Sequence, residues 1–256
     1  MQKDMSLAGR VSSSQKSIHP GLARMVNRHM SGPWLQPIHK ATLDAWNRLK
    51  LESGFSADSR FILDSGCGTG ASTQFLANLH PNLKVLGVDQ SDSRLSKNGV
   101  HDGFLIDGNL ILLRAELSSL WRLMLTEGYQ PEYHYLLYPN PWPKPGHLKR
   151  RWHGHPVFPD MLALGGAVEM RCNWDIYASE FAYATSLLCG QEISVQPYVA
   201  DTPMSLFEEK YKQRGHALYS VAIPAAVCAA YKHRRSVQEE LSSSADSNAG
   251  AAGGGV

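Results

Sequence analysis

The chain has 256 residues, enough for one large domain with a full hydrophobic core, and its 25 Lys and Arg nearly balance its 23 Asp and Glu. Net charge therefore does not indicate a polyanionic partner, and any nucleic-acid surface has to be local. No run of about 18 apolar residues could span a bilayer, and the four cysteines follow no metal-ligand spacing, so we expect a soluble cytoplasmic protein with reduced thiols.

Two terminal segments lack a core-forming pattern. Residues 1–18 are polar and rich in Ser and Lys, without the apolar stretch of a secretory signal, and residues 241–256 are rich in Ser, Ala and Gly. We expect both to be disordered, which leaves residues 19–240 as one domain. Within it, His19–Trp34 forms either a short basic helix on a partner or an N-terminal brace, and Pro37–Leu51 has the spacing of a helix that covers a sheet.

A buried strand runs into a glycine turn at Arg60–Gly70, RFILDSGCGTG, and a helix begins at Ala71. In such a strand, turn and helix the backbone approaches a nucleotide-like ligand closely. Asp64 stands two residues before the first glycine, where it would repel a phosphate but attract the positive sulfonium of S-adenosylmethionine. The alternative for Asp64 is a strand-end acid that caps the helix. The glycines of the turn are Gly66, Gly68 and Gly70.

The next two predicted strands each lead into an acidic residue. The strand Leu83–Asp89 ends in Asp89, a little more than the usual ~20 residues after the start of the glycine turn, where an acid accepts hydrogen bonds from a ribose diol. Gln90 follows as a further candidate for cofactor binding. Leu110–Arg114 precedes Glu116, which would lie at the carboxyl edge of the sheet and could accept from an adenine amine. Glu116 is equally consistent with an exposed acid near the start of a helix.

A proline-rich stretch, YPNPWPKPGHLKRRW, follows the fourth strand, Tyr133–Tyr138. Prolines fix their φ angles and disfavour helix at the preceding residue, so the backbone itself would aim the side chain of Asn140. Basic residues come next, where they would hold the phosphates of an RNA strand without reading its sequence. The alternative is a surface loop with a solvated charge run. The basic candidates are Lys144, His147 and Arg150, with Lys149, Arg151 and His153 in the same run.

The remaining chain continues the alternation of strands and helices. Strands are predicted at Ala167–Cys172, Gln191–Pro197 and Ala217–Ile223, and helices at Pro156–Gly166, after Asn173, and at Ser205–Gly215. The alternation predicts a Rossmann-like α/β domain with a seven-stranded, mostly parallel sheet and helices on both faces. The ligand of such a sheet binds at the carboxyl ends of its strands.

These motifs resemble the class I S-adenosylmethionine-dependent methyltransferases and, more narrowly, the TrmB-type tRNA (guanine-N7)-methyltransferases. The general resemblance is carried by LDSGCGTG and VLGVDQS. The stretch YPNPWPKPGHLKRR is similar to that family's FPDPWPK-x-x-H-x-K-R-R signature, and SLFEEKYKQRGHALY is similar to its T-x-x-E-x-K segment. The resemblance covers about Arg60 to Ile223 in the family's order. It implies S-adenosylmethionine as the cofactor and tRNA as the partner.

The resemblance also implies roles for single residues. The methionine, ribose and adenine parts of the cofactor would be held by Asp64, Asp89 and Glu116. The residues that fall where the family handles tRNA and its target base are Lys144, His147 and Arg150. The residues that stand on the substrate side, near the guanine, are Asn173, Ser205 and Glu208. The reaction implied is methylation of guanine N7 in the variable loop of tRNA.

Three positions depart from the family's pattern. Asn140 replaces the Asp of its DPW motif, Asn173 the Asp of its T-D-W/N segment, and Ser205 its Thr. Guanine N7 carries a lone pair and no proton, so it needs a positioning group more than a base. We take Asn140 as the catalytic candidate and also as a contact of the cofactor. Because an amide accepts without a charge, we expect transfer to slow about tenfold for each charge-assisted hydrogen bond lost.

The amide at this position also opens alternatives. Asn140-Pro-Trp142 resembles the Asn-Pro-Pro-aromatic motif of amino-group methyltransferases, in which an amide and a backbone carbonyl accept from the target amine. Trp142 or Tyr138 would then stack on the base, or both pack under the loop. Two further hypotheses follow: methylation of an amino nitrogen on another base or small molecule, and a non-catalytic paralogue that binds cofactor and RNA. The sequence implies no metal and leaves the oligomeric state open.

Overall fold

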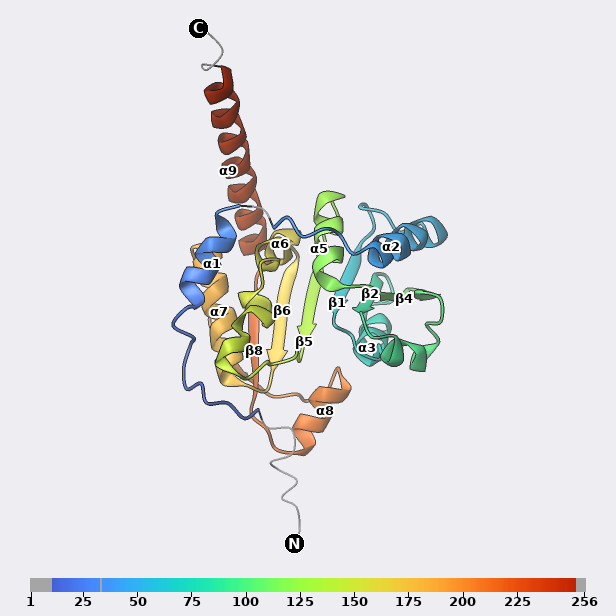
Figure 1. The fold of residues 1–256 in the computed structure, drawn as a ribbon. Coiled ribbons are helices and arrows are strands. Elements are labelled where there is room, and N and C mark those ends of the chain that lie inside the picture. The colour runs from blue at the N-terminus through green and yellow to red at the C-terminus, as the bar shows by residue number, and fades with distance from the viewer. Residues whose placement is uncertain (1–10, 33, 252–256) are drawn as a thin grey trace.

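The computed structural model describes residues 11–32 and 34–251, with side chains described as far as Leu241. At its centre is one eight-stranded sheet in the order β3-β4-β2-β1-β5-β6-β8-β7 (Figure 1). The strands are β1 (Phe61–Ser65), β2 (Lys84–Asp89), β3 (Phe104–Asp107), β4 (Leu110–Arg114), β5 (Tyr133–Leu137), β6 (Ala167–Cys172), β7 (Gln196–Tyr198) and β8 (Leu218–Ile223). Neighbours from β4 to β6 are parallel, whereas β3 pairs antiparallel with β4, β8 with β6, and β7 with β8.

Two edge strands differ from the prediction, while the Rossmann-like α/β fold with its mostly parallel sheet is confirmed. β3 is an eighth strand that the prediction does not include; its side chains are half-buried or exposed, and it forms a tight hairpin with β4. β7 begins later than the predicted Gln191–Pro197 strand. Ile193 and Val195 lie before the strand, in a segment without regular secondary structure, and pack against the larger core. Their alternating apolar pattern therefore reflects burial and not strand pairing.

Helices cover both faces of the sheet. They are α1 (Leu22–Met30), α2 (Lys40–Ser53), α3 (Ala71–Leu79), α4 (Asp92–Leu95), α5 (Leu117–Thr126), α6 (Phe158–Leu164), α7 (Asp175–Cys189), α8 (Leu206–Gln213) and α9 (Ala225–Ala251). The larger core includes Leu63 of β1 and lies under α1, α2, α5, α6, α7 and α9. The smaller core includes Ile62 and lies under α3 and α4. Successive residues of β1 therefore face opposite layers.

At the N-terminal end the structure favours the brace among the two alternatives for His19–Trp34, and at the C-terminal end it differs from the predicted disorder. α1 is a brace: Leu22 and Val26 are buried in the larger core, and the helix packs against α7. α9 projects from the body of the molecule (Figure 1), and residues 241–251 continue it as helix where the sequence predicts a disordered tail. Its Ala-rich composition favours helix. Residues 1–10 and 252–256 lie outside the described part. Within that part, no helix has the length and apolar character needed to cross a bilayer.

Candidate active site

A cavity of about 1000 Å³ opens at the carboxyl ends of β1, β2, β4 and β5. The strand order changes direction here, because β1 leads to β2 on one side and the chain later returns to β5 on the other. Open α/β sheets bind their ligands at such a switch point. The wall combines the glycine turn after β1, the proline-rich stretch after β5, and side chains of α8. The predicted cofactor and substrate sides therefore share one cavity.

The glycine turn exposes its backbone to the cavity. Gly66 and Gly68 line it with φ of 80° and 63°, conformations that favour glycine, and a Cβ at either position would stand in open space. The turn is fixed because Gly66 N donates to Val88 O at 2.8 Å. Gly70 precedes α3 at φ 87°, and a Cβ there would lie 2.9 Å from Leu112. A ligand can thus approach the turn closely.

Asp89 is preorganised at the cavity wall. Its Oδ2 accepts from Gly68 N at 3.0 Å and its Oδ1 from Ser91 N at 2.8 Å, with Arg94 Nη1 at 3.5 Å. Gln90 lines the wall beside it. The carboxylate keeps acceptor capacity for the hydroxyls of a ribose. Asp89 is thus available to a ligand in the cavity, and its ribose contact stays a prediction.

Asp64 lies behind the glycine turn, outside the cavity wall, and is fully buried. Its Oδ2 accepts from Ser72 Oγ at 2.6 Å and Thr73 Oγ1 at 2.8 Å, whereas Oδ1 has no hydrogen-bond partner. Burial raises the pKa of Asp64 to about 6, although the two hydroxyls oppose this. The structure thus makes Asp64 a clamp between β1 and α3 and does not place it in direct reach of the methionine part of a cofactor.

Glu116 lines the cavity and is also the N-cap of α5. Its Oε2 accepts from Ser119 N at 2.8 Å, and its Oε1 accepts from the backbone and hydroxyl of Ser118. Burial opposes ionisation, but these hydrogen bonds outweigh it and lower the pKa of Glu116. Glu116 is therefore a half-buried helix cap at the carboxyl edge of the sheet, not an exposed acid, and the adenine contact stays a prediction.

The segment Tyr138–Trp142, which we call the hook, holds Asn140 in a strained backbone. Of the described non-glycine residues, Tyr138 and Trp142 have positive φ, at 51° and 44°. Such conformations cost about 1–3 kcal/mol each and concentrate at functional sites. Asn140 stands between them, exposed on the cavity wall, and its Oδ1 accepts from Trp142 N at 3.4 Å. Asn140 thus lies at the cavity wall between two residues of strained backbone.

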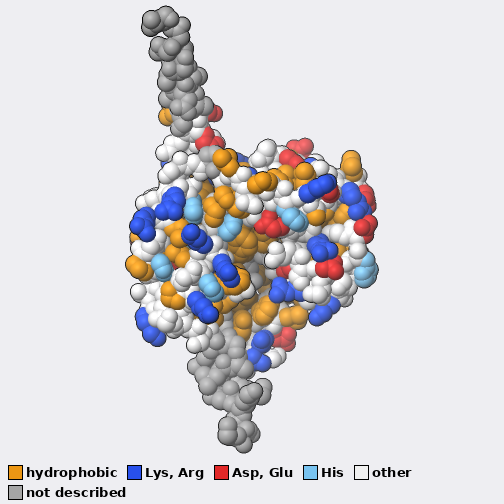
Figure 2. Space-filling view, in the orientation of Figure 1, with side chains coloured by type: hydrophobic (Ala, Val, Ile, Leu, Met, Phe, Trp, Pro, Cys, Tyr) orange, Lys and Arg blue, Asp and Glu red, His pale blue; other side chains and the backbone are white. Residues whose placement is uncertain are grey.

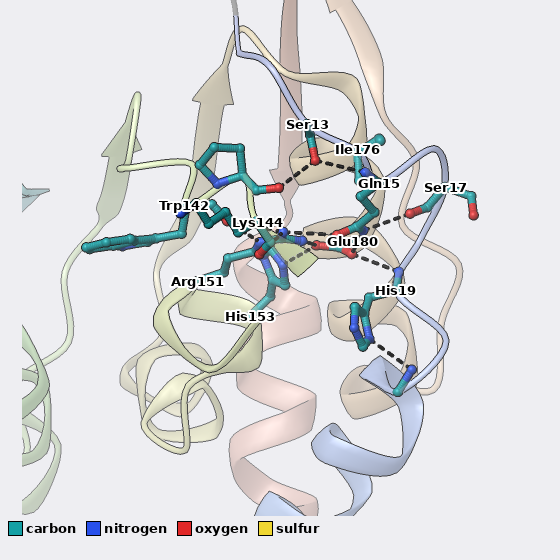
Figure 3. A network of polar contacts seen from close by, with 12 residues as sticks. Ser13, Gln15, Ser17, His19, Trp142, Lys144, Arg151, His153, Ile176 and Glu180 are labelled. Atoms are coloured by element: carbon teal, nitrogen blue, oxygen red, sulfur yellow. Dashed lines mark hydrogen bonds and ion pairs between the residues drawn. The ribbon is translucent and has the colours of Figure 1, made fainter. Parts of the chain in front are cut away.

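Arg151 supports the hook from behind (Figure 3). Its buried guanidinium donates to Trp142 O from Nε and Nη2, both at 3.2 Å, and pairs with Glu180. Burial alone would raise the pKa of Glu180, but His153 Nε2 at 2.9 Å and the Arg151 charge lower it to about 2. The sequence assigned Arg151 and His153 to a solvated or RNA-binding run. That assignment is wrong, because Glu180 gives Arg151 a counter-charge in the interior.

The N-terminal segment reaches the same network (Figure 3). Ser13 Oγ donates to Pro143 O at 2.5 Å, and Gln15 Nε2 donates to Glu180 Oε1 at 2.6 Å. Gln15 Oε1 accepts from Arg151 Nη2 at 3.0 Å. Residues 11–18 are therefore tied to the support of the hook, where the sequence predicts a mobile arm.

The predicted basic residues gather around Trp142. Arg150 lines the cavity, and its guanidinium lies over the Trp142 ring at 4.8 Å from the centroid. His147 packs edge-on against the same ring at 5.6 Å, and desolvation together with the Arg150 charge lowers its pKa. Lys144 is exposed and outside the cavity wall. Arg150 is thus the basic residue of this set that faces the cavity.

The substrate-side candidates separate in the structure. Ser205 and Asn173 line the cavity, whereas Glu208 is fully buried outside its wall. Its carboxylate accepts from Tyr138 OH at 2.9 Å and Arg171 Nη1 at 3.1 Å. A buried guanidinium needs such a counter-charge. Glu208 therefore ties α8 to the hook instead of lying at the position predicted for guanine contact.

Comparison with known proteins now places the chain. Residues 58–221, more than half of its length, match the family described as "Putative methyltransferase". The chain belongs to this methyltransferase family. The enzyme is an S-adenosylmethionine-dependent methyltransferase.

Relatives of known name resemble the methyltransferase over most of its length. The tRNA (guanine-N(7)-)-methyltransferase of Nitrosomonas eutropha is 25% identical over 189 residues, 67% of this chain and 79% of that one. That of Nitrosococcus oceani is 25% identical over 217 residues, 75% of this chain and 87% of that one. A solved 16S rRNA (adenine(1408)-N(1))-methyltransferase from Catenulisporales acidiphilia, with cosubstrate SAM, has a TM-score of 0.45 and 18% identity, over 70% and 89% of the two chains. The predicted TrmB-type resemblance is confirmed.

The residues of the methyltransferase cavity fit S-adenosylmethionine. The glycine turn leaves open space where side chains would stand, and the Asp89 carboxylate is fixed beside it. Bound there, the cofactor supplies an electrophilic methyl group. In the described ranges 11–32 and 34–251, no group of three or more His, Cys, Asp or Glu could hold a metal ion.

Sequence reasoning missed the part of the methyltransferase wall that comes from α8. Phe207, Lys210 and Tyr211 all line the cavity. The available signal was two aromatic residues four positions apart, which share one face of a helix. In the same segment, the family resemblance assigns roles only to Ser205 and Glu208. Trp152 and His155 also line the wall.

Proposed function

We propose that this methyltransferase transfers a methyl group to N7 of a guanine in the variable loop of tRNA. The observation that carries the proposal is that Asn140 and the glycine turn line the same cavity. A base held at the hook then faces the cofactor side. Two relatives named tRNA (guanine-N(7)-)-methyltransferases support the acceptor. With tRNA as the substrate, we place the enzyme in the cytoplasm.

The chemistry asks for positioning more than for proton transfer. Guanine N7 has a lone pair and no proton, so the chain has to align it with the methyl group and needs no general base. Asn140 Oδ1 has two lone pairs, and one of them accepts a long hydrogen bond from Trp142 N. The other can accept a hydrogen bond from the edge of guanine that carries N1–H and the amine. The product ring becomes cationic, and a neutral amide stabilises that charge less than a carboxylate does.

The rival with an amino acceptor has less support. In the amino-group motif, the aromatic residue after the Asn stacks on the target base. Here the Arg150 guanidinium lies over the Trp142 ring, and His147 packs against its edge. The Arg150 guanidinium therefore competes with a base for a face of this ring. We therefore propose the N7 acceptor alone.

The variable-loop assignment is tested with two tRNA transcripts that differ at one position. One carries the variable-loop guanine and the other has adenine there, and both are incubated with enzyme and methyl-labelled S-adenosylmethionine. We expect label in the first transcript and none above background in the second. Equal labelling of both transcripts would place the acceptor elsewhere, and the Asp89→Ala variant serves as the inactive control.

A further inference from the structure

The mouth of the cavity carries an aromatic surface that the cofactor side does not require. On α8, Phe207 and Tyr211 lie one helical turn apart with ring planes at 27° and centroids 6.1 Å apart. His216 continues the series and stacks on Tyr211 at 5.2 Å and 16°. Phe207 and Tyr211 line the cavity, and Phe207 is 45% exposed. We call these two residues the α8 platform.

Core packing does not account for the α8 platform. Neither ring belongs to the two hydrophobic cores or to the partly buried side chains that pack against them. Tyr211 does contact Tyr138 of the hook, with ring centroids 5.5 Å apart, which leaves Phe207 as the exposed ring. Leu206 next to Phe207 is 58% exposed. Figure 1 shows α8 beyond the carboxyl ends of the central strands, apart from the helices that cover the sheet. Exposed apolar side chains gathered at a cavity mouth are typical of a binding site.

Positive charges stand close to these rings. Lys210 Nζ lies 6.0 Å from the Phe207 centroid and 5.8 Å from that of Tyr211. Arg150 also lines the cavity, from the flank of the hook. Figure 2 shows Lys and Arg side chains interspersed with hydrophobic ones around the hollow of the face it displays. Of the acids on α8, Glu208 is buried and paired with Arg171, and Glu209 is exposed.

Ring faces combined with cations match one class of ligand. Single-stranded nucleic acid presents a base with a π face and a phosphate with a negative charge, and proteins bind it with aromatic platforms in basic grooves. A purely apolar peptide or lipid chain would gain nothing from the neighbouring Lys210. The combination of ring faces and positive charge therefore favours a nucleotide as the ligand, with its base on the rings and its phosphate near the cations.

We propose that the exposed ring of Phe207, backed by Tyr211, stacks against an unpaired base of the RNA next to the guanine that is methylated. This rests on the proposed function, because it takes tRNA as the ligand. The stacked base fixes the register of the strand so that the neighbouring guanine reaches Asn140. Since every base has a π face, the platform contributes affinity and register without reading base identity.

The test compares Phe207→Leu, which keeps an apolar side chain but removes the ring, with Phe207→Trp, which keeps a ring. The probes are unmodified tRNA, followed by anisotropy, and a short single-stranded RNA with one 2-aminopurine, whose fluorescence is quenched on stacking. We expect Phe207→Leu to weaken tRNA binding about tenfold, or about 1.4 kcal/mol, and to lose the quenching. Phe207→Trp should retain both. The control is Leu51→Ala, at an 86% exposed position on α2.

The salt dependence separates stacking from charge. Phe207→Leu should leave the slope of log Kd against log salt unchanged, because the ring carries no charge, whereas Lys210→Gln should lower it. Cofactor affinity should stay within about twofold of wild type. Wild-type RNA affinity and quenching in Phe207→Leu would overturn the platform, even if guanine N7 is methylated. Ring-dependent binding and quenching without N7 methylation would support the platform and remove the proposed acceptor.

Discussion

Replacing Glu180 by Gln tests the buried network that supports the hook. The change keeps the shape of the side chain but removes the counter-charge of Arg151, which is fully buried. The pKa of Glu180 is about 2 against 4.5 for a free Glu, which corresponds to about 3 kcal/mol at about 1.36 kcal/mol per pH unit. Breaking one partner of a buried ion pair costs about 3–5 kcal/mol in other proteins. The pKa shift and the cost of breaking a buried ion pair therefore both predict a loss of several kcal/mol in the free energy of unfolding.

Thermal unfolding measures this loss directly. At about 2–4 °C per kcal/mol for a domain of this size, the melting temperature of Glu180→Gln should fall by about 6–20 °C. A carboxyl whose folded pKa is lowered contributes stability above its unfolded pKa and loses it as the pH falls. The difference in melting temperature between Glu180→Gln and wild type should therefore shrink as the pH falls from 4.5 toward about 2.

The matched control is Glu239→Gln. The Glu239 side chain is 64% exposed, and the change breaks its ion pair with Arg235. Exposed pairs contribute about 1 kcal/mol or less, so its melting temperature should change little. Because Arg151 also holds Trp142 O, Glu180→Gln should lower kcat more than it weakens cofactor binding. A melting temperature within about 2 °C of wild type would refute the ionised network as a source of stability.

The other predictions concern the cavity itself. Asp89→Ala removes the acceptor at the ribose position and should weaken S-adenosylmethionine binding at least about tenfold in calorimetry; unchanged binding would exclude that position. Arg150→Gln should reduce the slope of log Kd for tRNA against log salt by about 0.9, and an unchanged slope would mean that Arg150 contacts no phosphate. Asn140→Asp restores a negative charge and should raise N7 methylation about tenfold, whereas a loss would show that the cavity is fitted to the amide. Burial raises the pKa of Asp64 to about 6, so below that pH the neutral carboxyl should reduce affinity for S-adenosylmethionine more than for S-adenosylhomocysteine, whose sulfur is uncharged; equal losses would contradict the charge argument.

The sequence predicted the elements whose pattern is local. β1 and the glycine turn were predictable because a short apolar run leads directly into three closely spaced glycines. β5 was predictable in the same way from its aromatic and apolar run. β3 carries a local signal too, since the apolar run Phe104-Leu105-Ile106 leads into Asp107-Gly108, a pair typical of tight hairpins, but four residues are too few to show a strand period. Positive φ at Tyr138 and Trp142 has no signal in residue type, since glycine usually marks it.

Side-chain roles that depend on distant partners could not be predicted. Arg151 stands in a basic run, and only the fold brings Glu180 of α7 and Gln15 against it. Glu208 occupies a position like that of an acid near the substrate in the family. Arg171 and the hydroxyl of Tyr138, which stands where the family signature has Phe, hold it in the interior instead. Long-range ion pairs decide which charged residues face the cavity, and sequence spacing does not record them.

The identity of the methylated nucleoside tests the central claim most directly. Bulk tRNA that lacks N7-methylguanosine is incubated with the enzyme and methyl-labelled S-adenosylmethionine, digested to nucleosides and analysed by mass spectrometry. The account predicts that the label appears in N7-methylguanosine and disappears with Asp89→Ala. Label in an amino-methylated nucleoside, or no label although the enzyme binds both cofactor and tRNA, would contradict it.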